Sequence, residues 1–128
     1  MSVEMQPPTA GVWPWPDSLD AISAAPAFHR LLLENDHVRV LEVRIKPGQF
    51  VPLHTHRWPS VMHVTSASDF LRRDAEGQLI FDSRSAGASQ RTPDVVWAPP
   101  LPPHSVENIG ASEIHVLAVE LKHAAAGC

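Results

Sequence analysis

Hydrophobic and charged side chains alternate along residues 37–46, HVRVLEVRIK. Leu41, Val43 and Ile45 share one parity, and the charged residues that follow each of them share the other. Successive side chains of an extended chain point to opposite faces, so this alternation predicts a half-buried β-strand. The Pro-Gly pair at 47–48 predicts where that strand ends.

Much of the remaining chain consists of short extended segments separated by turn residues. In the segment that follows residue 48, Phe50, Pro52, His54 and His56 are expected to share one face. Further strands are predicted at 60–67, 69–73, 78–84, 94–99, 104–110 and 113–121. The turn sequence DAEG predicts a hairpin between the second and third of these, and the last segment is apolar on both parities, which predicts burial.

Many short strands punctuated by proline and glycine indicate an all-β antiparallel sandwich or barrel. The 13 prolines in 128 residues disfavour a helical bundle, because proline breaks helix interiors. A chain of this length is expected to form one domain. The predicted organisation is an N-terminal arm and short helix at 1–34, a single barrel domain at 35–123, and a tail at 124–128, with a loop at 85–93.

The N-terminal part has a different character from the strands. Residues 1–16 end in GVWPWP and predict an extended arm whose tryptophans pack in a surface groove. The next segment, DSLDAISAAP, predicts a short helix with Asp17 or Ser18 as its cap and Pro26 as its end.

Charge and composition exclude several classes of partner. The net charge is −4, from 10 basic and 14 acidic residues, and no Lys/Arg cluster indicates nucleic acid or an anionic membrane as partner. Apolar runs are far shorter than the roughly 20 residues of a membrane helix, and the first residues do not resemble a signal peptide. Cys128 is the single cysteine, which excludes an intramolecular disulfide and favours a cytoplasmic location.

His54 and His56 stand two residues apart on predicted extended chain. Side chains at this spacing point the same way and lie roughly 6.5–7 Å apart along the backbone. Two imidazoles can then lean onto one ion at metal–nitrogen distances of about 2.0–2.1 Å. The pair is therefore a candidate for metal binding.

Two separated motifs resemble the signatures of the cupin superfamily. Gly48, five residues, and then His-Thr-His at 54–56 match G-x5-H-x-H. PDVVWAPPLPPHSVEN resembles the second signature, G-x5-P-x-G-x2-H-x3-N, through Pro99, His104 and Asn108. The resemblance, over about residues 35–121, implies a cupin-type antiparallel jelly-roll barrel. It also implies that His54, His56 and His104 hold a divalent transition metal, which the sequence leaves open as Fe, Zn, Ni, Cu or Mn.

The chain also departs from the cupin pattern. Ser60 stands in the place of the usual glutamate, and Pro93 and Leu101 replace the two glycines of the second signature. The expected site thus has three neutral histidines and no carboxylate, which makes the ion a stronger Lewis acid and suits an anionic, chelating substrate. Ser60 could hold a metal-bound water. Arg39 could point a cation into the cavity, although an arginine at a strand end more often forms a structural ion pair.

The remaining candidate residues are expected to have structural roles. His63 is predicted on the outer face, and His115 as a core or interface histidine with satisfied hydrogen bonds. Asn108 is predicted to orient a loop. Core packing is expected for Trp58 and Trp97, and surface or turn positions for His29, His37 and His123.

Three functions remain open at this point. The resemblance favours a small-molecule-processing metalloprotein of the non-haem dioxygenase type. The alternative is a non-catalytic cupin module that binds a metal or small molecule. A metal-free isomerase with a histidine base is weaker, because such a base needs a carboxylate beside it. A small-molecule ligand and a homodimer are the expected partners.

Overall fold

The computed structural model describes residues 13–85 and 94–123. Within them, nine strands form two antiparallel sheets. The five-stranded sheet has the order β1-β2-β9-β4-β7, with β1 (His29–Glu34), β2 (Val38–Ile45), β9 (Ile114–Leu121), β4 (Ser60–Ser66) and β7 (Val95–Ala98). The four-stranded sheet has the order β3-β8-β5-β6, with β3 (Phe50–His56), β8 (Leu101–Asn108), β5 (Phe70–Asp74) and β6 (Leu79–Asp82).

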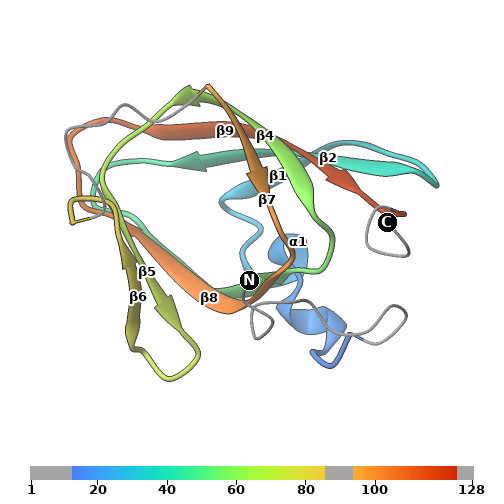
Figure 1. Cartoon of the computed structure of the whole chain (residues 1–128), viewed down its shortest axis with the longest axis horizontal. Coiled ribbons are helices and arrows are strands. Elements are labelled where there is room, and N and C mark those ends of the chain that lie inside the picture. Colours follow the sequence, from blue (N-terminus) through green and yellow to red (C-terminus); the bar gives the residue numbers. More distant parts are fainter. Residues whose placement is uncertain (1–12, 86–93, 124–128) are drawn as a thin grey trace.

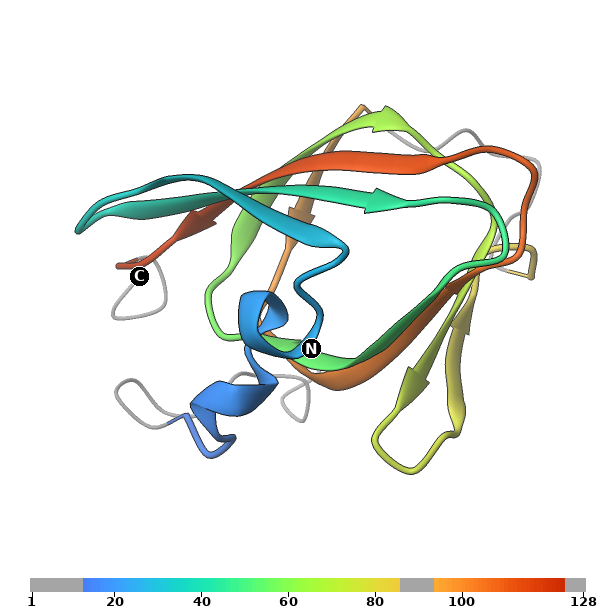
Figure 2. The same cartoon turned by 180° about the vertical axis from the view of Figure 1, so that it is seen from behind.

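The two sheets face each other across the interior of the molecule (Figure 1). A short helix, α1 (Ala21–Ala24), lies beside β3 and β1. Seen from behind, the β1–β2 hairpin extends past the barrel on one side and the β5–β6 hairpin on the other (Figure 2). The predicted all-β antiparallel barrel with one short N-terminal helix is confirmed.

Strand β2 forms where the alternation predicts it. Its inward side chains include Leu41 and Ile45, which are 0% and 4% exposed, because apolar groups gain most from leaving water on this face. The predicted β5–β6 hairpin is also present, closed around Gly77, whose φ of 81° suits glycine. β8 starts at Leu101, so it includes two prolines that the sequence analysis places before the strand.

Strand β3 corrects the predicted inward face. The register of β3 against β8 shifts between Val51 and His54, so strict alternation fails there. Val51 is buried with the two histidines, whereas Phe50 is 51% exposed and Pro52 is exposed as well. Phe50 and Pro52 therefore do not share the face of His54 and His56.

Two further differences concern the N-terminal part. Residues 29–34, expected in the arm and helix region, form strand β1 and pair with β2. The cap of α1 is Asp20, whose carboxylate accepts from the Ile22 backbone N–H at 3.2 Å, so neither Asp17 nor Ser18 is the cap. The predictions for the beginning of the arm, most of the loop at 85–93 and the tail lie outside the described residues.

Helices capable of crossing a bilayer are absent from the described part of the chain.

Candidate metal centre

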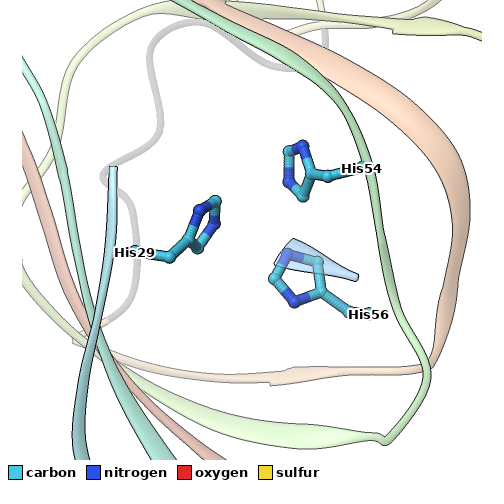
Figure 3. A group of neighbouring side chains, drawn as sticks. All are labelled: His29, His54 and His56. Atoms are coloured by element: carbon cyan, nitrogen blue, oxygen red, sulfur yellow. The ribbon is translucent and has the colours of Figure 1, made fainter. Parts of the chain in front are cut away.

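Four buried histidines face the interior from both sheets. His54 and His56 come from β3, His104 lies directly opposite His54 in β8, and His29 begins β1 of the other sheet. Their exposed fractions lie between 2% and 9%. Figure 3 shows His29, His54 and His56 turned toward a common space. We call these four residues the histidine cluster.

The rings of the histidine cluster lie close together. The centroid of His54 is 4.3 Å from that of His104, 5.0 Å from that of His56 and 4.9 Å from that of His29. One ring nitrogen from each of His29, His54 and His56 lies within 4.8 Å of the others. The structure thus brings His54 and His56 together with His29 in this group. His104, the third residue that the resemblance implies, lies outside it, with its ring centroid 5.6 Å from that of His56.

His29 is buried, although it was expected at the surface or in a turn. The residue is 5% exposed, because β1 folds back along β2 and carries its first side chain inward. The sequence offers little signal: Arg30 separates His29 from the three leucines that follow, and no histidine stands two residues away.

Hydrogen bonds orient every ring of the cluster in the same way. Nδ1 of His29 lies 3.1 Å from the Ala25 carbonyl oxygen, and Nδ1 of His54 and of His104 lies 2.8 Å from the carbonyl of the proline two residues earlier. Nδ1 of His56 lies 3.2 Å from Oε2 of Glu120. Since carbonyl and carboxylate oxygens accept, each Nδ1 is the donor, and the lone pair of a neutral ring then lies on Nε2. This arrangement, with a carbonyl or carboxylate behind each ring, is typical of metal-bound histidine.

Burial keeps His29, His54 and His104 uncharged at neutral pH. Desolvation and the neighbouring His56 lower the pKa of His29 to about 4 and that of His54 to about 3. Desolvation, together with His54 and His56, also lowers the pKa of His104 well below its ordinary value. Neutral imidazoles are the form that binds a metal, and they suit zinc, copper, iron and nickel.

Behind His56 lies a buried ion-pair network. Nε of Arg39 is 2.6 Å from Oε1 of Glu120, and its two terminal nitrogens are each 2.9 Å from the carboxylate of Asp20. Burial opposes the charge of Arg39, but its bonds to Asp20 and Glu120 raise the pKa. Burial likewise raises the pKa of Asp20, yet the hydrogen bonds and charge of Arg39 outweigh it, and the net pKa is lowered.

Glu120 places a carboxylate behind the histidine cluster, at a position that the cupin motifs do not indicate. It is 1% exposed and touches the cluster through His56, although it comes from β9 rather than from the first motif. Its signal in the sequence is a lone charge on the inward parity of an apolar strand. Of the two cavity candidates, Arg39 takes the structural ion pair, and Ser60 is buried opposite Glu120 in the β4–β9 ladder.

A cavity of about 500 Å³ lies between the sheets, and all four residues of the histidine cluster line it. Most of its other walls are apolar, from strands of both sheets. Neither Arg39 nor Ser60 is among the lining residues, and among the described residues no carboxylate lines the cavity. The cavity has the size and apolar character of a small-molecule site.

The other candidate residues mostly take the expected structural roles. His37, His63 and His123 are exposed, and His115 is half-buried with Nε2 2.7 Å from Glu42. Trp97 differs from the expected core packing, since it lines the cavity while 57% exposed. Asn108 donates to the Ile45 and Ser112 carbonyls and accepts from the Gly110 N–H, so it ties the turn after β8 to the end of β2. Trp58 is half-buried and packs on Arg39, whose Cζ is 5.0 Å from the ring centroid.

Acid is expected to destabilise the metal-free protein through this cluster. Because the pKa of His29 is lower in the folded than in the unfolded state, the unfolded state takes up more protons as the pH falls below about 6.5. The free energy of unfolding should therefore fall by about 2 kcal/mol or more between pH 7 and pH 4.5 from His29 alone. Urea denaturation of chelator-treated protein measures this, and His29→Gln should reduce the pH dependence. Equal stability at the two pH values would contradict the assigned burial.

Comparison with solved structures places the fold. A cupin domain from Bordetella pertussis Tohama I matches with a TM-score of 0.57 and 21% identity, over 73% of this chain and 91% of that one. An RmlC-like cupin family protein with a double-stranded β-helix fold from Methanocaldococcus jannaschii matches with a TM-score of 0.53 and 13% identity, over 74% of this chain and 79% of that one. A conserved protein with a double-stranded β-helix domain from Klebsiella pneumoniae matches with a TM-score of 0.52 and 19% identity, over 76% of this chain and 77% of that one. The chain thus has the cupin double-stranded β-helix fold. No protein-family profile matches the sequence, and no curated protein does.

Proposed function

We propose that this cupin-fold protein binds a divalent transition metal through the histidine cluster and processes a small molecule in the adjoining cavity, as a dioxygenase of the non-haem type. The observation that carries the proposal is the common orientation of the four rings, with Nδ1 held by an oxygen and Nε2 left for an ion. When bound, such an ion supplies a Lewis-acid and redox centre for a chelating substrate.

The protein's own residues prepare the site for this chemistry. Glu120 holds the ring of His56, while the carbonyls of Pro52 and Pro102 hold His54 and His104 on neighbouring strands. The apolar walls of the cavity provide a surface for the body of a substrate.

Metal analysis and oxygen uptake test the proposal together. Protein purified without a polyhistidine tag is expected to carry close to one transition-metal ion per chain. The iron-loaded protein should consume oxygen with one member of a panel of 1,3-dicarbonyls and small thiols, without added reductant, because a dioxygenase delivers both oxygen atoms to the substrate. His54→Ala should abolish uptake. A silent panel with iron fully loaded would count against the dioxygenase, and activity that survives chelation would favour a metal-free base.

One observation favours a second candidate, a non-catalytic binding module. Among the described residues, Arg72 is the single ionisable residue besides the histidine cluster that lines the cavity. Proton-transfer chemistry usually relies on such groups close to the substrate. A bound metal and a bound small molecule, without oxygen uptake for any member of the panel, would identify this module.

A further inference from the structure

Arg72 is the one arginine that lines the cavity, and among the described residues its side chain has no hydrogen-bond or ion-pair partner. Arg72 lies in the middle of β5 and lines the cavity together with Phe70, which has the same parity. Its Nε atom is buried and makes no hydrogen bond. Arg72 as a whole is half-buried, but a buried donor atom without a hydrogen-bond partner is costly and requires an explanation.

Comparison with the other arginines shows that this state is unusual for the chain. Each of the other six described arginines has a carboxylate oxygen within 4.0 Å: Arg30, Arg39, Arg44, Arg57, Arg73 and Arg84. Arg73, the next residue along β5, has Glu107 at 3.1 Å. Arg72 instead has the rings of Phe70 and Phe81, with its Cζ 5.7 and 5.9 Å from their centroids.

The hydroxyl groups along the cavity do not compete for this role. Ser66 donates to the Glu113 carbonyl, Ser68 to Asn108, and Ser83 to Asp69. Their donor hydrogens are therefore already used inside the protein. Arg72 is left as the charged donor that a ligand in the cavity can reach.

The register of the sheet places Arg72 near the histidine cluster. Arg72 lies opposite Val106 in β8, and His104 is two residues from Val106 on the same face. Such diagonal neighbours are about 7–8 Å apart at the backbone. The positive charge is close enough to contribute to lowering the pKa of both His54 and His104, after the larger effects of burial and neighbouring histidines.

We propose that Arg72 is the anion anchor of the cavity, which selects a small monocarboxylate whose apolar body packs against Phe70 and Phe81. Its role as a substrate anchor rests on the proposed function, because the same ligand would reach the histidine cluster with a chelating group a few bonds from the carboxylate. A planar guanidinium binds a carboxylate with two parallel hydrogen bonds, a geometry that lysine cannot reproduce.

A matched pair of ligands tests the anchor in metal-free protein. Hexanoate and hexanamide have the same shape and differ in charge, and NMR-detected titration of chelator-treated protein measures both dissociation constants. Hexanoate is expected to bind wild-type protein about tenfold or more tightly than hexanamide, because a hydrogen bond to a charged group is stronger than a neutral one. Equal affinities in wild-type protein would overturn the proposal.

Three variants attribute the preference to one residue. Arg72→Met should remove the preference for hexanoate, and Arg72→Lys should keep part of it. Arg73→Met is the matched control, since its side chain pairs with Glu107 away from the cavity, and it should keep the full preference. A preference that persists in Arg72→Met would overturn the assignment. Circular dichroism confirms folding of each variant.

Metal binding by the same variants separates this inference from the proposed function. Arg72→Met should bind one equivalent of Co²⁺, as wild-type protein does. If wild-type protein binds no metal but its hexanoate preference depends on Arg72, the anion anchor stands and the proposed function fails. If metal binds and no preference exists, the anchor fails and the metal centre stands.

Discussion

Replacing Arg39 with methionine is expected to lower the free energy of unfolding by about 3–5 kcal/mol. The Arg39 side chain is 8% exposed and binds two carboxylates, and the Glu120 side chain is 1% exposed. Removing the cation leaves the charge of Glu120 buried without its main partner. This penalty, rather than the net contribution of the ion pair, sets the expected size of the effect.

Chemical denaturation with Arg44→Met as control measures this loss. Arg44 lies on the same strand, but its side chain is 52% exposed and its ion pairs with Glu42 and Glu113 are solvated. Its replacement should cost less than about 1 kcal/mol. A loss in Arg39→Met no larger than in Arg44→Met would show that the network does not carry the stability assigned to it. The double variant Arg39→Met/Glu120→Gln should recover part of the loss, because the second change removes the unpaired charge.

Replacing His54 with alanine is expected to weaken metal binding by at least about 100-fold, more than the 10- to 100-fold typical of losing a residue that only orients a ligand. His54 is the most central of the cluster, since its ring centroid lies within about 5 Å of those of the three other histidines. Competition with a chromophoric chelator measures the affinity. His37→Ala, an exposed histidine outside the cluster, should leave the affinity unchanged.

Comparison of His29→Ala with His104→Ala then assigns the remaining ligands. Both rings lie near His54, but they come from opposite sheets. A loss of affinity comparable with that of His54→Ala in both variants identifies a four-histidine site. A loss confined to His104→Ala would restore the three-histidine site that the cupin resemblance implies and would leave His29 as a structural residue.

Local patterns were sufficient for most of the strands and for half of the cluster. The alternation in 38–45 and the hairpin of β5 and β6 depend on neighbours in sequence, which set the direction of side chains in an extended chain. The His-Thr-His pair indicated its own metal chemistry for the same reason. His104 followed from the resemblance of two motifs to the cupin signatures rather than from a local pattern.

Tertiary pairing decided the rest of the site. The shift in β3 turned Val51 inward and Phe50 outward, and such a register change depends on the partner strand β8. His29 joins the histidine cluster because β1 folds against β2. Arg72 lines the same cavity because β5 pairs with β8.

The sequence by itself determined that this chain is an all-β antiparallel sandwich or barrel with two histidines on one face of one strand. Only the tertiary structure decided that Arg39 meets Glu120, which stand 81 residues apart, and that the glutamate supports His56 from behind. A charged residue on the inward parity of a strand indicates that a partner exists. The partner's identity depends on which strands become neighbours and in which register, and that is settled by the packing of the whole barrel.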